Sequence, residues 1–408
     1  MDRPSSEADG RRDSLPCDRL PLVQAGWGFR HLEGIRVVDL TGSIAGPYAT
    51  MLLADFGAEV IKVERPQGDD ARHWGPPFLN GEALWFAAVN RNKKSVVLDL
   101  SRPDARADLD ALIRTADVVV TNQTPDVQAK LGMDYQTLRQ LREDLVFVSI
   151  TGFGLTGERA DLTCYDLIAE GYSGIMDITG PTGAEPQKIG APAADMLAGQ
   201  DAAMATMAVL FERQKTGQGA QIDISLVESM TRFLACRISS YLGSGEVPVR
   251  SGGTDSVIAI YQPFETADLP LNLGLGSDAI WRRFWTALGD PDFAARPEYG
   301  SNILRREKRA EIVERIQQIL RQQPRARWLA LFASARIPAG PINRVDEVAM
   351  DAALHDRGLF FALQDGPGRI VPQIGLGIRI DDRPATPRAA PPLLGQHTDD
   401  ILAEIGRR

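Results

Sequence analysis

The chain has 408 residues, 44% of them hydrophobic and 24% charged, a composition typical of a packed globular protein with two or three domains. A net charge of −9 argues against a nucleic-acid surface, and no apolar run approaches the roughly 18 residues that a membrane-spanning helix needs. Its 3 cysteines and 4 histidines are scattered and form neither a disulfide framework nor a metal site. We therefore expect a cytoplasmic protein without a metal, a nucleic-acid partner or a membrane partner.

The N-terminal segment, residues 1–30, mixes charges of both signs. It lacks the apolar stretch that a secretory signal contains. We interpret it as a loosely ordered extension.

From residue 34 the chain alternates between strand and helix patterns. β-Branched apolar runs predict strands at 34–40, 58–64, 95–100, 116–122 and 145–152. Helical patterns lie between them at 44–57, 103–115 and 135–143. This alternation predicts an α/β fold with a mostly parallel, doubly wound sheet.

The later part of the chain predicts a second, smaller domain. A long helix at about 195–215, a strand at 220–226 and a helix at 227–242 precede a loop rich in Gly and Ser. We predict the following organisation: a large α/β domain at 31–225, a linker helix and loop at 226–256, a small α+β domain at 257–336, and a connection at 337–408 that returns to the large domain.

Several common active-site motifs are missing. A dinucleotide-binding turn needs G-x-G-x-x-G, but in TGSIAGPYA the residues Gly42 and Gly46 are out of register and Pro47 lacks an N–H group. The chain also lacks the phosphate-binding G-x-x-x-x-G-K-S/T motif and the G-x-S-x-G motif of serine hydrolases. These absences disfavour a nicotinamide enzyme, a P-loop enzyme and a hydrolase triad.

Two basic segments allow two interpretations each. Arg65, at the end of a predicted strand, is either a solvated cation or a two-pronged phosphate ligand. Residues 90–95, NRNKKS, form either a solvated loop or an edge that faces a phosphate. The residues alone leave both questions open.

Asp166 lies at the start of a predicted helix, in LTCYDLIAEGYSGIMDITG. Thr163 and Asp166 fit a capping box, in which each side chain bonds to the backbone of the other. Alternatively, Asp166 is a carboxylate nucleophile that attacks a thioester and forms a mixed anhydride. Local chemistry does not choose between these alternatives. Cys164, with no matching histidine nearby, is expected to be small buried filler.

From about residue 33 to 404 the sequence resembles the family III CoA-transferases, the group of formyl-CoA transferase and carnitine CoA-transferase. The motifs that carry the resemblance are GIRVVDLTGSIAGPYATMLLADFGAEVIKVERPQGDD, NRNKKSVVLDL, ADVVVTN, SITGFGLTG, YDLIAEGYSGIMDITG, KTGQGAQIDISLVESM, IPAGPINRVDEV and PPLLGQHTDDIL. The resemblance implies that Asp166 is the catalytic aspartate. It also implies a large Rossmann-like domain built from both chain ends, a small α+β domain, and ring-like monomers that interlock as a homodimer.

The resemblance further implies a binding site for CoA, which is a substrate and not a permanently bound cofactor. The matching positions are Ile44, Ala45, Arg65, Leu98, Asn122, Thr124, Lys130 and Thr151. Two segments, 252–264 and 267–281, depart from the family pattern, so the resemblance does not extend to the substrate loop.

The main alternative is the α-methylacyl-CoA racemase branch, in which an acid and a base move a proton. The racemase motif has a histidine directly before the aspartate, where this chain has Tyr165. Asp195 aligns with a racemase acid, but without the histidine the pair is incomplete. A binding module without catalysis is a third interpretation.

The segment GDDARHWGPPF (68–78) resembles the branch that uses dicarboxylates. We therefore expect succinyl-CoA or a similar donor and a C4–C6 dicarboxylate acceptor. Arg72 and Arg91 are candidates to hold the far carboxylate of the acceptor, because a guanidinium orients a carboxylate with two hydrogen bonds. The alternative is that both arginines stabilise the loop around CoA.

Overall fold

A computed structural model describes residues 15–23, 26, 28–365 and 369–406 of the chain. Residues 1–14, 24–25 and 27 of the predicted N-terminal extension lie outside these described residues. None of the helices within the described ranges combines the length and apolarity that a bilayer crossing requires.

The chain forms two compact units, neither of which is one continuous stretch. The first contains the described residues of Met1–Ser173, Gly190–Ala235 and Asp351–Arg408, and the second contains Gly174–Ile189 and Cys236–Met350. The C-terminal residues from Asp351 onward thus pack with the N-terminal part of the chain.

The first unit is built on a six-stranded sheet in which all neighbouring strands are parallel. In chain order its strands are β2 (Arg36–Asp39), β3 (Glu59–Glu64), β6 (Lys93–Val97), β7 (Val118–Thr121), β8 (Val146–Thr151) and β9 (Ala220–Ser225). Their order across the sheet is β6-β3-β2-β7-β8-β9. The predicted α/β fold with a parallel sheet is confirmed, and the strand order is that of a Rossmann fold.

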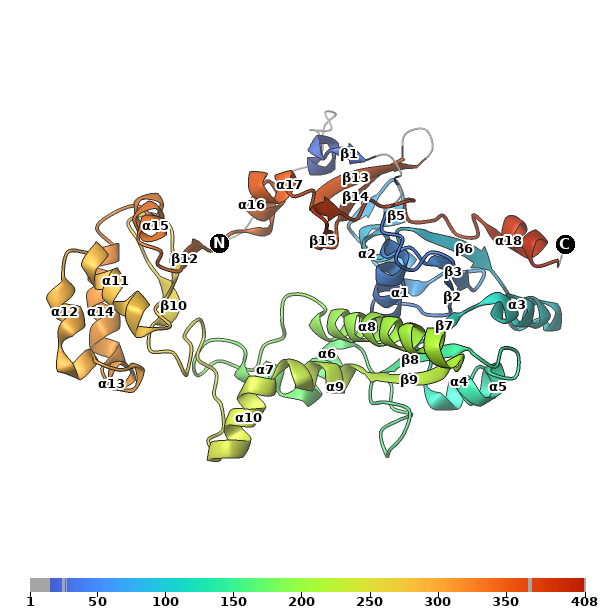
Figure 1. Cartoon of the computed structure of the whole chain (residues 1–408), viewed down its shortest axis with the longest axis horizontal. Coiled ribbons are helices and arrows are strands. Elements are labelled where there is room, and N and C mark those ends of the chain that lie inside the picture. The colour runs from blue at the N-terminus through green and yellow to red at the C-terminus, as the bar shows by residue number, and fades with distance from the viewer. Residues whose placement is uncertain (1–14, 24–25, 27, 366–368, 407–408) are drawn as a thin grey trace. The chain divides into compact units, whose positions relative to one another are not determined.

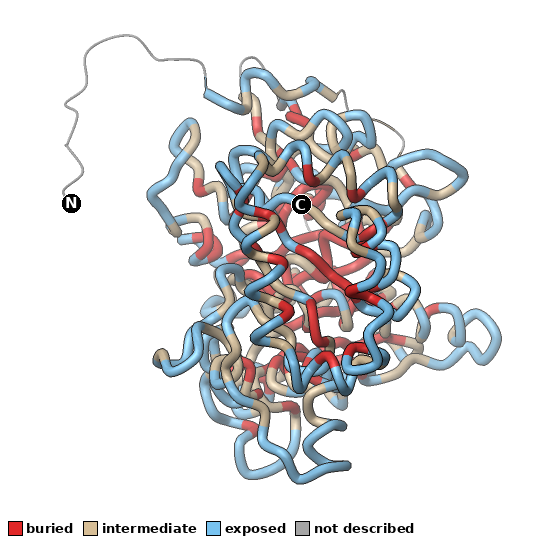
Figure 2. The backbone as a smooth tube through the Cα atoms, turned by 90° about the vertical axis from the view of Figure 1, so that its left-hand side faces the viewer, coloured by how far each residue is buried: buried red, intermediate tan, exposed pale blue. Residues whose placement is uncertain are grey.

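Helices cover both faces of this sheet (Figure 1). On one face, strand residues such as Val38 and Phe147 share a buried core with the helices α3 (Pro103–Thr115), α5 (Tyr135–Leu138) and α18 (Thr398–Glu404). The helices α1 (Ala45–Asp55) and α8 (Ala193–Thr216) contact strands and each other on the opposite face. Figure 2 shows the buried residues, in red, inside a layer of exposed backbone.

Small residues allow α8 to pack closely on α1. A Cβ atom on Gly199 would lie 2.6 Å from the backbone oxygen of Ala45, so only glycine permits this approach. The contact holds the N-terminus of α8 beside the turn that begins α1.

The remaining elements of the first unit flank the sheet. They are η1 (Pro16–Arg19), β1 (Leu22–Val23), η2 (Asp70–His73), β4 (Phe78–Leu79), β5 (Glu82–Ala83), α2 (Leu84–Ala88), α4 (Pro125–Leu131), α6 (Asp166–Ser173), α9 (Leu226–Phe233), α17 (Ala352–Asp356), β13 (Phe360–Asp365), β14 (Arg369–Ile374), β15 (Arg379–Ile380) and β16 (Arg383–Pro384). Strands β1, β13 and β14 form a small sheet that joins the two ends of the chain.

The second unit has its own core of buried aromatic side chains, which include Trp281, Trp285 and Phe332. An antiparallel sheet consists of β10 (Tyr261–Phe264), β11 (Leu271–Gly274) and β12 (Ala339–Pro341). Its helices are α7 (Ile175–Ile178), α10 (Ala235–Ser244), α11 (Asp278–Ala287), α12 (Pro291–Ala295), η3 (Pro297–Tyr299), α13 (Asn302–Glu307), α14 (Arg309–Leu320), α15 (Arg325–Ser334) and α16 (Val345–Ala349).

Two predicted helices differ from the structure. The helix predicted at 135–143 is the short α5, which ends at Leu138. The helix predicted at 227–242 is divided into α9 and α10 at Leu234, and the boundary between the two units follows at Ala235.

Candidate active site

The candidate site lies at the carboxyl ends of β2 and β7, where the strand order reverses. In a doubly wound sheet the loops after two such strands diverge, and the crevice between them is the usual ligand site. Asn122 joins the two loops, because its Oδ1 accepts from the Gly42 N–H at 3.2 Å and its Nδ2 donates to the Gly42 carbonyl at 2.9 Å.

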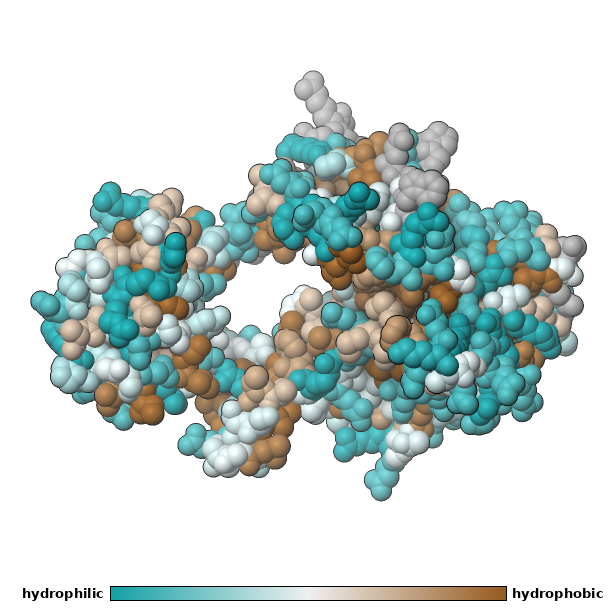
Figure 3. Space-filling view, in the orientation of Figure 1, coloured by the Kyte–Doolittle hydropathy of each residue, from teal (hydrophilic) through white to brown (hydrophobic). Residues whose placement is uncertain are grey.

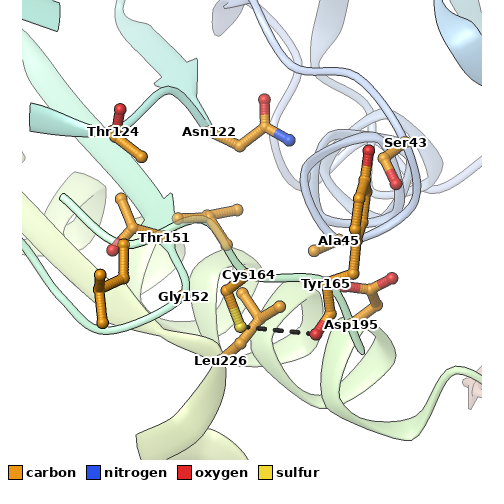
Figure 4. A pocket seen from close by; sticks show the side chains of 12 residues that line it. Ser43, Ala45, Asn122, Thr124, Thr151, Gly152, Cys164, Tyr165, Asp195 and Leu226 are labelled. Carbon is orange, nitrogen blue, oxygen red and sulfur yellow. Dashed lines mark hydrogen bonds between the residues drawn. The ribbon is translucent and has the colours of Figure 1, made fainter. Parts of the chain in front are cut away.

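A pocket of about 90 Å³ opens at this place (Figure 4). It is lined by Ser43, Ala45, Asn122, Thr124, Ile150, Thr151, Gly152, Leu162, Cys164, Tyr165, Asp195 and Leu226. No Lys, Arg or His is among these lining residues. The ionisable groups of the pocket wall are therefore an aspartate, a tyrosine and a cysteine.

A buried charge network fixes the turn at Ser43, which has a positive φ of 70°. The Ser43 N–H donates to Asp69 Oδ1 at 3.0 Å, and Lys62 Nζ lies 2.9 Å from Asp69 Oδ2. Burial opposes the charge on Asp69, but the Lys62 ammonium outweighs this effect and lowers the pKa of the carboxyl group. The network holds the strained turn in a conformation that faces the pocket.

Asp166 is the first residue of α6, and its carboxylate reaches the N-terminus of α8. Its Oδ1 accepts from the backbone N–H groups of Ala194 at 2.8 Å and Asp195 at 3.2 Å. Asp166 therefore does cap a helix, but it caps α8 and not its own helix. The partial positive charge at the N-terminus of a 24-residue helix stabilises a carboxylate there.

Asp195 brings a second carboxyl group to the same place. Only 8% of the residue is exposed, and it lines the pocket next to Tyr165. Burial, and then the charge of Asp166, raise the pKa of Asp195 to about 7. Two carboxyl groups with different environments thus lie at one helix N-terminus.

Cys164 is half-buried at the pocket wall and is not the buried filler that the sequence predicted. Burial, with a contribution from the Asp195 charge, raises the pKa of its thiol to about 11. The side chain packs on Gly152, where an added Cβ would lie 2.1 Å from the Cys164 Cβ. Glycine at 152 therefore lets the loop after β8 approach the segment that carries Asp166.

The predicted CoA-binding residues lie in different surroundings. Ala45, Asn122, Thr124 and Thr151 line the pocket. The other predicted positions lie outside its lining: buried Ile44, core residue Leu98, half-exposed Arg65 and exposed Lys130. Arg65 pairs with Asp70 and donates from Nε to the Gly68 carbonyl at 3.0 Å. Their contacts with CoA stay predictions.

Both arginines predicted to hold the acceptor already have a partner carboxylate. Arg72 forms two hydrogen bonds of 2.7 Å to Glu64 and stacks over Phe86. Arg91 is 3% exposed in its side chain and binds both oxygens of the equally buried Asp55. Neither arginine is among the pocket-lining residues, and whether they hold the acceptor or stabilise the loop around CoA stays a prediction.

Residues 90–95 do not form a solvated loop, because all of them except Lys94 are buried. Lys93 is fully buried at the start of β6 and donates to Asp39 at 3.1 Å and to the Pro47 carbonyl at 2.8 Å. Burial lowers the pKa of Lys93 to about 8, although the charge of Asp39 opposes that shift. The segment is therefore part of the polar core beneath α1.

The sequence patterns did not single out five of the pocket residues: Ser43, Ile150, Gly152, Leu162 and Leu226. Asp195 was noted only for its match to a racemase acid. One signal was available for Asp195: an acidic residue in the first turn of a long predicted helix. The other missed pocket residues lie far apart in the sequence, and only the order of the strands in the sheet brings them together.

The comparisons with known proteins identify the family of the chain. The family model described as CoA-transferase family III matches residues 32–398. The chain belongs to CoA-transferase family III. The resemblance that the sequence motifs indicated is therefore confirmed, and with it the CoA-transferase class.

Relatives of this family III chain match it over nearly their whole length. A succinate–glutarate CoA-transferase of Agrobacterium fabrum is 38% identical over 381 residues, which cover 92% of this chain and 95% of the relative. A succinyl-CoA:mesaconate CoA-transferase of Haloarcula marismortui is 35% identical over 387 residues, covering 92% and 96%. The crystal structure of a CAIB/BAIF family protein from Brucella suis has 37% identity and a TM-score of 0.80, and the match covers 92% of this chain and 99% of that chain.

Proposed function

We propose that this family III enzyme moves CoA from succinyl-CoA, or a similar short dicarboxylyl-CoA, to a C4–C6 dicarboxylate. The names of its relatives, a succinate–glutarate and a succinyl-CoA:mesaconate CoA-transferase, support this substrate class. The decisive screen offers succinyl-, acetyl- and formyl-CoA with mono- and dicarboxylates and identifies products by mass spectrometry. Preference for monocarboxylate acceptors would contradict the proposal.

We propose covalent catalysis by Asp166. A carboxylate oxygen of Asp166 attacks the thioester carbon, the C–S bond breaks, and a mixed anhydride and CoA thiolate form. The thiolate attacks Asp166 Cγ and releases the donor acid, leaving an aspartyl–CoA thioester. The acceptor carboxylate then attacks Cγ, and the released thiolate attacks the acceptor's carbonyl. The products are the new acyl-CoA and free Asp166.

The hydrogen bonds of Asp166 carry this proposal, because they distinguish its two oxygens. Oδ1 is held by the Ala194 and Asp195 N–H groups, which leaves Oδ2 as the attacking atom. When the thiolate or the acceptor attacks Cγ, negative charge develops on an oxygen that two backbone donors already bind. Preorganised donors of this kind stabilise tetrahedral intermediates.

Substitution tests this role. Asp166→Asn and Asp166→Ala should abolish transferase activity while CoA binding persists, as measured by calorimetry. Asp201→Asn is the matched control, because Asp201 lies further along α8 and pairs with Arg232. Retained turnover by both Asp166 variants would contradict the covalent mechanism.

The racemase alternative has less support. Proton transfer needs an acid and a base on either side of the substrate carbon, and no histidine is among the pocket-lining residues. The relatives described above bear transferase names. Deuterium exchange at the α-carbon of a 2-methylacyl-CoA, without transfer of CoA, would support the racemase.

We also propose that two chains form an interlocked homodimer. Exposed apolar side chains on α8, α9 and α10 support a partner surface in each unit: Met204, Phe211, Phe233, Tyr241 and Leu242. In Figure 3 brown, hydrophobic surface lies beside white surface over α10. Interlocked chains cannot exchange without unfolding. Mixed dimers that form within minutes from tagged and untagged protein would contradict this arrangement.

A further inference from the structure

The Asp195 side chain lies at the pocket wall, in a residue that is 8% exposed. Within the described part of the chain, no hydrogen bond or ion pair reaches either of its side-chain oxygens. Its backbone N–H, in contrast, is used to hold Asp166 at 3.2 Å. Neither oxygen belongs to the fully buried side-chain atoms without a partner, so the carboxyl group keeps surface that a ligand in the pocket can reach.

The surroundings of Asp195 disfavour its charged form. The titratable groups on the elements around this end of α8 are Asp166, Glu170 and Tyr172 on α6, Tyr48 and Asp55 on α1, Glu228 and Arg232 on α9, Asp223 on β9, and Cys164 and Tyr165 on the loop before α6. Among the pocket-lining residues there is no cation that would pair with an ionised Asp195. The negative charge of Asp166 opposes a second negative charge beside it.

A neutral carboxyl group has a hydrogen-bond donor that an ionised one lacks. We propose that Asp195, in its protonated form, donates a hydrogen bond to the carbonyl oxygen of the thioester that Asp166 attacks. This inference rests on the proposed covalent role of Asp166. Figure 4 shows the Asp195 side chain among the pocket residues, beside Tyr165 and Ala45.

The attack of Asp166 on the thioester does not require Asp195 to transfer its proton. The bond from Asp166 to the carbonyl carbon forms, the C=O electron pair moves onto oxygen, and the Asp195 O–H stabilises that oxyanion. When the C–S bond breaks, the carbonyl is restored and Asp195 keeps its proton. In this role Asp195 is a catalytic residue, because it touches the reacting atoms.

Activity should follow the protonation of Asp195. The wild-type kcat with succinyl-CoA and glutarate should fall as the pH rises above about 7, where the carboxyl group loses its proton. Asp195→Asn keeps an N–H donor and cannot ionise, so its kcat should stay constant between pH 6 and 8.5. Asp195→Ala lacks a donor, and its kcat at pH 6 should be about 100- to 1000-fold below wild type.

The control is Asp201→Asn on the same helix, which should keep the wild-type pH profile. Any of three results would overturn the proposal. The first is an Ala variant as active as wild type, and the second is an Asn variant as impaired as the Ala variant. The third is a wild-type kcat that rises through pH 7. If the Ala variant does not fold, the pH profile of the Asn variant decides.

Trapping with hydroxylamine separates this inference from the proposed function. Labelled Asp166 in a fully active Asp195→Ala variant would overturn the role of Asp195 alone. Wild-type enzyme that turns over without any label on Asp166 would overturn the covalent mechanism, and this inference with it.

Discussion

Replacing Arg91 with alanine tests whether this residue stabilises the fold or binds the acceptor. Its Nη2 lies 2.6 Å from Asp55 Oδ2, and its Nε lies 3.0 Å from Oδ1. Its Nη1 donates to the Ile374 carbonyl at 2.8 Å and to Gln373 Oε1 at 3.2 Å. The guanidinium thus connects the C-terminal end of α1 to β14, which lies more than 280 residues further along the chain.

The loss of stability follows from burial. The side chains of Arg91 and Asp55 are each 3% exposed, so Arg91→Ala leaves a carboxylate inside the protein without its cation. Breaking a buried pair by removing one partner costs about 3–5 kcal/mol. Arg91→Lys keeps the charge but not the two-pronged geometry, so it should lose part of that free energy of unfolding. Urea denaturation followed by circular dichroism measures both values.

Two controls separate the charge from other effects. Arg102→Ala removes an arginine from an exposed pair with Asp104 and should leave the free energy of unfolding nearly unchanged. The double variant Asp55→Leu with Arg91→Met removes both charges and should be more stable than Arg91→Ala. An Arg91→Ala variant that unfolds like wild type but loses its preference for dicarboxylates would refute this reasoning and restore the substrate role.

Three further predictions concern the site. If Arg65 contacts the nucleotide phosphate, Arg65→Ala should weaken the binding of CoA about ten- to a hundredfold more than the binding of dephospho-CoA. Calorimetry measures both affinities, and equal losses would place Arg65 elsewhere. Because the pKa of Asp195 rises from 3.8 to about 7 on folding, ionisation of this group should contribute a fall of about 3 kcal/mol to the free energy of unfolding between pH 4 and pH 7. Asp195→Asn should lack that part of the fall, and identical pH curves in urea denaturation would contradict the shift. At pH 8, iodoacetamide should alkylate exposed Cys236 before Cys164. The pKa of about 11 leaves only about one in a thousand Cys164 side chains as the reactive thiolate. Equal alkylation rates in mass spectrometry would contradict this.

The parallel sheet was predictable because its strands are short β-branched runs separated by helices. Buried parallel strands have this continuous apolar pattern, as in Val118–Thr121, which is buried throughout. The break at Leu234 was not predictable in the same way. Helical periodicity continues across it, and only the change from one compact unit to the other coincides with the interruption.

The candidate site was predictable only in part, because its key contacts are long-range. Asp166 binds backbone groups 28 and 29 residues later, whereas the local pattern suggested Thr163, three residues earlier, as its capping partner. The partner of Arg91 lies 36 residues before it. Sequence spacing identifies charged residues but does not show which charges are already neutralised by a distant partner.

The covalent role of Asp166 is the central claim, and chemical trapping tests it most directly. Enzyme that is turning over succinyl-CoA and a dicarboxylate is treated with hydroxylamine, digested and analysed by mass spectrometry. We predict a hydroxamate on the peptide that contains Asp166, which disappears when acyl-CoA is omitted. Modification of a different acidic residue, or undiminished turnover with no modified peptide, would contradict the account.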